Sequence, residues 1–282
     1  MTPSSHYLTC EGRELHYMEW GDPQSPPLIM WHGLARTCRD FDDIAAELAG
    51  RYHIICPDTI GRGLSQWSPQ PDTEYCLAFY ARLAASLLDQ LGLQQVRWIG
   101  TSMGGAIGLK AAATTLKGRI SHLVLNDIGT RLQQSALDRI KSYAGKPPRF
   151  DTVSELEQYL RTIYIPYGWQ SDAQWRRMTE TSVRRLPDGG ITTHYDPAMV
   201  RQFFNYPDDY VLEAEYASLT IPVLVLRGES SDLLTQDTAQ QMTQTGPRAQ
   251  LITVPGCGHA PCLNVPQQIE PVARFLARPT PG

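Results

Sequence analysis

Residues 96–106 limit the possible folds more than any other part of the chain. They read as a short apolar strand, then Gly-x-Ser-x-Gly at 100–104, then a run of small residues that opens a helix. This order is typical of a nucleophile elbow, in which a strand breaks sharply into a helix with a serine at the tip. Glycines fit there because neighbouring backbone comes close. Ser102 would lie at the helix N-terminus, where free N–H groups favour a developing oxyanion.

The five-residue motif is weak on its own, because a chain with 22 glycines can contain it by chance. The alternation of apolar strands and helices around it provides the structural context. The ranges predicted as strands are 15–20, 27–31, 53–56, 121–126, 222–226 and 249–254, and those predicted as helices are 41–49, 76–91, 235–243 and 266–277. Such alternation implies a parallel sheet covered by helices on both faces.

The pattern changes in residues 130–218, where short helical pieces and turn signals replace the strand rhythm and aromatic residues are dense. We therefore predict a core domain of residues 1–129 and 219–282, with a helical cap of residues 130–218 inserted into it. The cap aromatics are expected to line an apolar pocket above Ser102. The alternative is that they fill a small core of the cap itself.

The overall composition excludes several classes of function. With 282 residues and 42% hydrophobic residues, the chain can bury the core of one large α/β domain, with or without an insertion. A net charge of −4 without blocks of like charge disfavours nucleic acid or an anionic membrane as a partner. The six cysteines are scattered, which favours reduced thiols. Residues 1–11 lack the pattern of a secretory signal, so we expect a cytoplasmic protein.

Acyl transfer needs a nucleophile, a base beside it, a group that orients the base, and an oxyanion hole. A serine hydroxyl is a weak nucleophile, so Ser102 needs a base. His259 is the best candidate among the seven histidines, because it follows the last predicted strand in a glycine-flanked loop. His32 is the rival, and we interpret it as a structural histidine that holds the oxyanion loop.

Two acids compete to orient His259. Asp232 follows the predicted strand 223–226 after a short loop, and Asp127 lies directly at the end of the strand 123–126. Both satisfy the chain order serine, acid, histidine. We favour Asp232 as the orienting acid and keep Asp127 as the alternative. The acid that is not used is expected to cap a loop.

The oxyanion hole is expected to use two backbone N–H groups. One belongs to Met103, which follows the nucleophile, and the other to Leu34, which follows His32-Gly33 after the third strand. Arg36 lies next to this loop and could meet a carboxylate of the substrate. We favour the other interpretation of Arg36, which is a solvated surface arginine.

Several pieces of the chain, taken in their order and spacing, resemble the α/β-hydrolase fold superfamily along nearly the whole length. They are His32-Gly33-Leu34, the loop 58–65, the elbow 100–105, Arg227-Gly228 with Ser231-Asp232, and Gly258-His259-Ala260-Pro261. The resemblance implies an eight-stranded, mostly parallel sheet with helices on both faces and a helical cap inserted after the sixth strand. In this family the acid usually follows the seventh strand, which supports Asp232. The loop 58–65 resembles a family loop that is mainly structural.

Departures from individual subfamilies narrow the expected reaction. Related haloalkane dehalogenases and epoxide hydrolases use an Asp nucleophile, which Ser102 disfavours. Hydrolases of meta-cleavage products have a glycine-rich oxyanion loop and usually a Trp after the catalytic His. Here the loop reads Gly33-Leu34-Ala35-Arg36, and Ala260 follows His259. The His-Gly-Gly-Gly loop of hormone-sensitive-lipase-type esterases is absent. Carboxylesterase, lactonase and thioesterase chemistry remain.

The sequence therefore predicts a serine hydrolase that cleaves a small carboxylic ester or lactone through an acyl-enzyme on Ser102. One alternative is carbon–carbon bond hydrolysis of a ring-fission product, and another is a non-catalytic ligand receptor on the same fold. The expected partner is a small-molecule substrate, with no cofactor and no metal. Cys257 and Cys262 flank His259, but their spacing does not match a zinc site, and we expect them to serve in packing.

Overall fold

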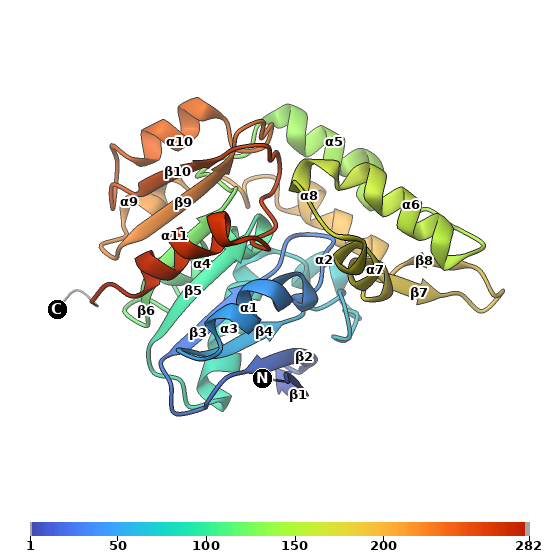
Figure 1. Ribbon diagram of the computed structural model, residues 1–282, viewed down its shortest axis with the longest axis horizontal. Coiled ribbons are helices and arrows are strands. Elements are labelled where there is room, and N and C mark those ends of the chain that lie inside the picture. The colour runs from blue at the N-terminus through green and yellow to red at the C-terminus, as the bar shows by residue number, and fades with distance from the viewer. Residues whose placement is uncertain (1, 280–282) are drawn as a thin grey trace.

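The computed structural model describes residues 2–279. Their central feature is an eight-stranded sheet (Figure 1). Its strands are β1 (Ser4–Cys10), β2 (Arg13–Trp20), β3 (Pro27–Trp31), β4 (His53–Pro57), β5 (Val96–Thr101), β6 (Ile120–Asn126), β9 (Val223–Gly228) and β10 (Gln250–Val254). The spatial order is β1-β2-β4-β3-β5-β6-β9-β10. Within this sheet only the pairs β1–β2 and β2–β4 are antiparallel, so the predicted mostly parallel sheet is confirmed.

Strand β1 is the one sheet strand that the sequence pattern did not indicate. Its burial alternates between exposed and half-buried positions, and only Cys10 at its end is fully buried. An edge strand of this kind lacks the continuous apolar run by which the central strands are recognised. It is held by a complete antiparallel register with β2, from Ser4 opposite Glu19 to Cys10 opposite Arg13.

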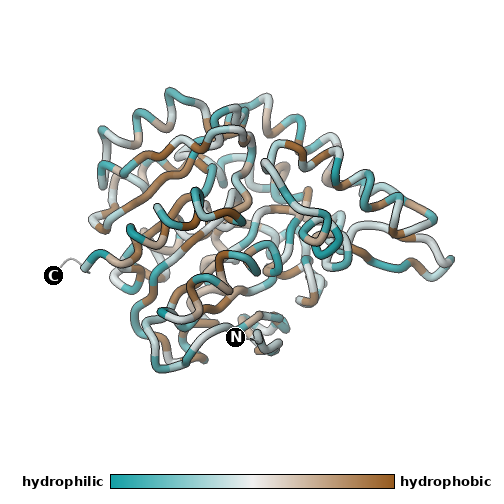
Figure 2. Tube along the Cα trace, viewed as in Figure 1, coloured by the Kyte–Doolittle hydropathy of each residue, from teal (hydrophilic) through white to brown (hydrophobic). Residues whose placement is uncertain are grey.

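Helices cover both faces of the sheet, as predicted. One face packs against α1 (Asp42–Leu48) and α11 (Pro266–Leu276), and the other against α3 (Leu77–Gln90), α4 (Met103–Ala113), α9 (Glu213–Ala217) and α10 (Gln236–Met242). Successive residues of β3 alternate between the two cores: Leu28 and Met30 face α1, whereas Ile29 and Trp31 face α3 and α4. The strands are therefore apolar almost throughout, as the hydropathy colouring of the central strands shows (Figure 2).

Residues 130–218, called the cap segment below, connect β6 to β9. Most of the segment gathers at one end of the sheet, whereas its last helix, α9, lies beside α10 (Figure 1). The segment contains α5 (Gln134–Ala144), α6 (Val153–Ile163), α7 (Asp172–Glu180), α8 (Gln202–Asn205) and α9, the short helices η2 (Ile165–Tyr167) and η3 (Pro197–Arg201), and the hairpin of β7 (Val183–Arg185) and β8 (Ile191–Thr193). The hairpin departs from the helical pattern expected there.

The cap segment is only partly independent of the main core. Leu156, Leu160 and Trp175 belong to a small cluster of its own, whereas Tyr195 and Phe203 join the main core under the sheet. The division into a core domain and a separate cap therefore stays a prediction. In the described residues, no helix is long and apolar enough to cross a membrane.

Candidate active site

The turn between β5 and α4 has the strained geometry expected of a nucleophile elbow. Ser102 has φ 52° and ψ −118°, a region that residues with side chains rarely occupy. A β-carbon on Gly100 would lie 2.2 Å from Gly104 O, and one on Gly104 would lie 1.9 Å from Trp31 O. Because both distances are far below contact, only glycine fits at these two positions. The Ser102 N–H donates to Asn126 O at 2.9 Å, which fixes the turn against β6.

His259 connects the serine to a buried acid. Its Nε2 lies 2.9 Å from Ser102 Oγ, and its Nδ1 lies 2.7 Å from Asp127 Oδ2. A carboxylate can only accept, so Nδ1 carries the proton that it donates to Asp127. The lone pair of Nε2 is then free to accept the Ser102 hydroxyl proton. This is the arrangement that general-base activation of a serine requires.

Asp127 lies fully buried at the end of β6, with φ 55°. Its Oδ1 accepts from the Gly228 N–H at 2.8 Å, and its Oδ2 accepts from the Ser231 hydroxyl at 2.6 Å as well as from His259. Three donors thus satisfy the carboxylate away from water, which is how a buried acid is held at low free-energy cost. Ser231 was part of the family resemblance, but the sequence offered no signal for its contact with Asp127.

The preference for Asp232 over Asp127 is wrong. The Asp232 side chain is 55% exposed and pairs with Arg139 of α5. The physical reason lies in the turn after β9, where the Ser231 N–H bonds to Gly228 O at 2.9 Å. This turn directs Ser231 toward Asp127 and carries Asp232 outward to the mouth of the cavity. Of the two candidate acids, only Asp127 contacts His259.

The loop after β3 brings Leu34 beside the nucleophile. Gly33 and Leu34 line the same cavity as Ser102 and His259, and Met103 begins α4 directly after the serine. In the described part of the chain, neither the Leu34 N–H nor the Met103 N–H is engaged by a turn, loop or cap hydrogen bond. The two N–H groups therefore remain our prediction for the oxyanion hole.

His32 is a structural histidine, as interpreted from the sequence. The side chain is fully buried, and its Nδ1 donates to Gly33 O at 2.7 Å while its Nε2 accepts from the Thr59 N–H at 2.9 Å. Burial lowers the pKa of His32, so the imidazole is neutral and can make both contacts. It fixes the backbone immediately before Leu34.

A cavity of about 790 Å³ opens above Ser102 and His259. Its wall combines core residues with apolar and aromatic side chains of the cap segment, namely Ile140, Tyr159, Ile163, Tyr164, Ile165 and Tyr167. The expectation that cap aromatics line a pocket therefore fits these three tyrosines. Other aromatics follow the alternative and fill hydrophobic clusters, as Trp175 and Phe203 do.

Arg36 lies in the wall of this cavity and is only 2% exposed, so its interpretation as a solvated surface arginine is wrong. Its Nε and Nη2 donate to Asp40 at 2.8 and 2.5 Å, and its Nη1 donates to Ser182 at 3.0 Å. Burial acts to lower the pKa of Arg36, but the Asp40 carboxylate outweighs it and the pKa is raised. The guanidinium is therefore a permanent buried cation.

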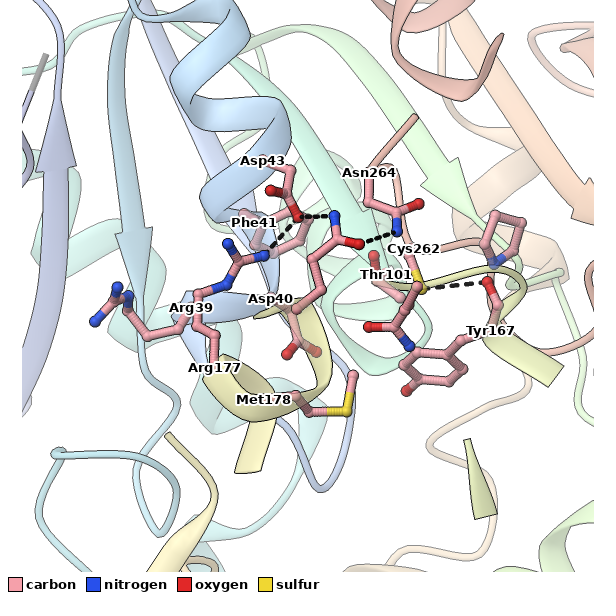
Figure 3. Close-up of a pocket in the computed structure, with 13 residues that line it drawn as sticks. Arg39, Asp40, Phe41, Asp43, Thr101, Tyr167, Arg177, Met178, Cys262 and Asn264 are labelled. Carbon is pink, nitrogen blue, oxygen red and sulfur yellow. Dashed lines mark hydrogen bonds and ion pairs between the residues drawn. The ribbon is translucent and has the colours of Figure 1, made fainter. Parts of the chain in front are cut away.

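A second, much smaller cavity of about 30 Å³ lies behind Tyr167, which lines both (Figure 3). Polar and charged side chains surround it. Arg177 and Gln174 of α7 contact Asp43 of α1 at 2.5 and 3.0 Å. These contacts join the cap segment to the core, and the space itself is too small for a substrate.

No metal motif was found in the sequence, and the structure contains one cluster of possible metal ligands in its described residues. In the described residues, ligand atoms of His16, Cys38 and Asp58 lie within 4.8 Å of one another. His16 Nδ1 already bonds to Asp58 Oδ2 at 2.7 Å, and the Cys38 and Leu64 N–H groups occupy the rest of that carboxylate. Burial raises the pKa of the Cys38 thiol well above its usual value. The cluster is therefore satisfied without an ion and stabilises the loop 58–65.

Comparison with known proteins gives a consistent result. The family model for the alpha/beta hydrolase fold matches residues 26–266, a range that contains Ser102, Asp127 and His259. A 3-hydroxybutyrate-oligomer hydrolase from Cupriavidus necator is 38% identical over 272 residues, which cover 92% of each chain. A 2-(acetamidomethylene)succinate hydrolase from Mesorhizobium japonicum is 27% identical over 83% of this chain and 81% of its own. Among solved structures, an alpha/beta hydrolase from Novosphingobium aromaticivorans has a TM-score of 0.84 and 33% identity over 97% of this chain and 98% of its own.

Proposed function

This chain belongs to the α/β-hydrolase family and is a hydrolase, and on that premise we propose that it cleaves carboxylic ester bonds through an acyl-enzyme on Ser102. The observation that carries the proposal is the hydrogen-bonded series from Ser102 through His259 to Asp127 at the base of a largely apolar cavity. A nucleophile, a base and an orienting acid in this geometry suit acyl transfer.

In the first half of the reaction, His259 Nε2 takes the Ser102 hydroxyl proton as Oγ attacks the ester carbonyl carbon. The Leu34 and Met103 N–H groups stabilise the oxyanion of the tetrahedral intermediate, and each such donor contributes about 3 kcal/mol in comparable sites. The intermediate collapses when His259 returns the proton to the alkoxide oxygen, and the alcohol leaves. The acyl group then remains on Ser102.

In the second half, water replaces the alcohol. His259 takes a proton from the water, whose oxygen attacks the acyl carbon, and the Ser102 oxygen leaves with that proton. The products are an alcohol and a carboxylic acid, so the atoms balance with no further reactant. Asp127 keeps Nδ1 protonated throughout, so Nε2 is the nitrogen that exchanges protons with Ser102.

For the substrate we propose short oligomers of a 3-hydroxy acid. The relative from Cupriavidus necator, 38% identical, is named for hydrolysis of 3-hydroxybutyrate oligomers. The names of both curated relatives specify derivatives of carboxylic acids. A cavity of about 790 Å³ is within the size range that holds a small organic ligand, and its apolar wall suits methyl and methylene groups.

The test combines an active-site label with a substrate comparison. A fluorophosphonate should label Ser102 in the folded wild-type protein and not the Ser102→Ala variant, and only the wild type should hydrolyse a 3-hydroxybutyrate dimer. The exposed Ser218→Ala variant serves as the matched serine control. Folded wild-type protein that is not labelled would instead favour a ligand receptor. Faster turnover of a ring-fission diketone than of any ester would favour carbon–carbon bond hydrolysis.

A further inference from the structure

The catalytic cavity contains a cation deep in its wall that the reaction described above does not use. Three charged side chains line the cavity. Two of them, Arg139 and Asp232, are about half exposed and form an ion pair with each other at the mouth of the cavity. Arg36 differs from both, because it is buried and faces the interior of the cavity wall. The cavity that contains Ser102 is therefore lined in part by a buried arginine.

Arg36 is also close to the nucleophile. A β-carbon built on Gly33 would lie 3.6 Å from Ser102 Cβ and 3.9 Å from Arg36 Cγ, so little more than Gly33 separates the two side chains. Arg36 belongs to the same tight turn as the predicted oxyanion donor, because its N–H bonds to Gly33 O at 3.3 Å. The stem of the Arg36 side chain is thus anchored beside the nucleophile.

The hydrogen bonds of Arg36 within the protein do not use all the N–H groups of its guanidinium. Asp40 takes the Nε–H and one Nη2–H, and Ser182 takes one Nη1–H. These contacts use three of the five N–H groups of the guanidinium. Asp40 lines the small cavity of Figure 3 and not the catalytic cavity. The Tyr164 ring, 4.9 Å from the guanidinium carbon, also lines the catalytic cavity and packs against the fork on that side.

We propose that Arg36 binds a free carboxylate of the substrate and so makes the enzyme selective for esters of hydroxy acids. Guanidinium donors pair best with carboxylate oxygens, and charge-assisted hydrogen bonds in an apolar surrounding are stronger than those to neutral carbonyls. Asp40 offsets the cost of burying the cation and orients it, while the remaining N–H groups can donate to a carboxylate of the ligand.

This inference rests on the proposed ester hydrolysis and specifies which esters are preferred. In a 3-hydroxy acid dimer, a carbinol carbon and one methylene separate the scissile ester oxygen from the free carboxylate. The carboxylate is therefore close to the reacting carbonyl, as Arg36 is close to Ser102. A neutral ester of the same shape has no charge at that position and lacks this contact.

The experiment compares a 3-hydroxybutyrate dimer with its methyl ester, which differs only in that carboxylate. We expect the wild type to prefer the acid. In Arg36→Gln the ratio of kcat/KM for acid over methyl ester should fall about 10- to 100-fold, mainly through KM, as loss of a hydrogen bond to a charged group implies. Arg36→Lys should recover part of the ratio. Arg39→Gln is the matched control, because Arg39 pairs with Asp42 outside the catalytic cavity and should leave the ratio unchanged.

Two results would overturn the assignment: an unchanged ratio in Arg36→Gln, or an equal loss on both substrates, which would indicate only a structural role. If Arg36→Gln does not fold because Asp40 is left unpaired, the double variant Arg36→Gln/Asp40→Asn removes both charges. Inhibition of the wild type provides a test without substitution, in which butyrate should inhibit more strongly than 2-pentanone, a neutral molecule of similar size that has no ester bond. Equal inhibition would contradict the proposal. Fluorophosphonate labelling of Ser102 in each variant separates these outcomes from failure of the proposed ester hydrolysis itself.

Discussion

The Asp127 carboxylate and the His259 imidazole meet at the carboxyl ends of the strands, with 2.7 Å between Oδ2 and Nδ1. Asp127 follows β6 directly and is fully buried, whereas His259 lies in the loop after β10. The Gly228 N–H and the Ser231 hydroxyl hold the carboxylate from the side of β9. The position of the imidazole is therefore determined by three neighbouring segments of the sheet edge, which leaves Nε2 facing Ser102.

The assignment of the acid can be tested with two matched substitutions. Asp127→Asn should lower kcat about 10⁴-fold, because an amide in place of the carboxylate favours the wrong imidazole tautomer. Asp232→Asn should change kcat less than about 5-fold, since loss of an exposed ion pair typically changes the free energy by less than about 1 kcal/mol. Steady-state kinetics on one ester measure both. The reverse result, with Asp232→Asn the inactive variant, would restore the assignment that we rejected.

Ser231 is expected to act as a positioning residue through Asp127. Ser231→Ala removes the 2.6 Å hydrogen bond to Oδ2 and should lower kcat about 10-fold, as expected for loss of a hydrogen bond to a charged acceptor. Because the effect acts through Asp127, the loss caused by Ser231→Ala should be much smaller when Asp127→Asn is already present. The neighbouring Ser230, which donates to Cys257 O, provides the control in Ser230→Ala. Equal losses with and without Asp127→Asn would mean that Ser231 does not act through Asp127.

Close packing at the elbow predicts a strong effect of a single methyl group. In Gly104→Ala the new β-carbon would lie 1.9 Å from Trp31 O and 2.8 Å from His32 O, so β3 and α4 must separate. We expect the free energy of unfolding to fall by about 2 kcal/mol or more. Gly50→Ala is the control, because no atom lies within 4 Å of its added carbon, and its change should stay within about 0.5 kcal/mol. Urea denaturation measures both values, and similar losses in the two variants would contradict the packing argument.

The buried histidines predict loss of stability in mild acid. Burial lowers the pKa of His122 to about 4, with Arg97 and Arg278 acting in the same direction. Between about pH 6 and pH 4 the unfolded chain binds a proton at this residue and the folded protein does not, so acid favours unfolding. The free energy of unfolding should fall by about 1.4 kcal/mol per pH unit from this group alone. Urea denaturation at pH 6 and pH 5 gives the free energy of unfolding at each pH. Its decrease between the two pH values should be smaller in His122→Gln than in the wild type by about 1.4 kcal/mol.

The control for the pH experiment is Ser218→Ala, which removes an exposed side chain without a titratable group. It should retain the wild-type dependence on pH, whereas an identical slope in His122→Gln and the wild type would show that His122 does not contribute. Burial also lowers the pKa of His194, to about 3, so this second histidine should add to the same trend. Carboxylates with lowered pKa values, such as Asp58, act in the same direction and account for the remaining slope.

The order of strands and the location of Ser102 and His259 were predictable because each follows an apolar run that could only be a buried strand. Parallel strands bring their carboxyl ends to one edge, so residues far apart in the chain were expected to meet there. The strand β1 was missed because its exposed face lacks that apolar signal. The hairpin β7–β8 was missed because three-residue strands carry too little periodicity to be recognised.

The amino-acid sequence by itself determined the covered parallel sheet, the glycine-bounded elbow and the pairing of Ser102 with His259, since these follow from local pattern and strand order. Only the tertiary structure decided between Asp127 and Asp232, because both lie after strands at the same sheet edge and a single turn at Gly228 selects which one faces inward. The position of Arg36 was likewise undecided, because burial of a charged side chain depends on Asp40 and the cap segment closing around it. Long-range packing makes these choices, and no local pattern records them.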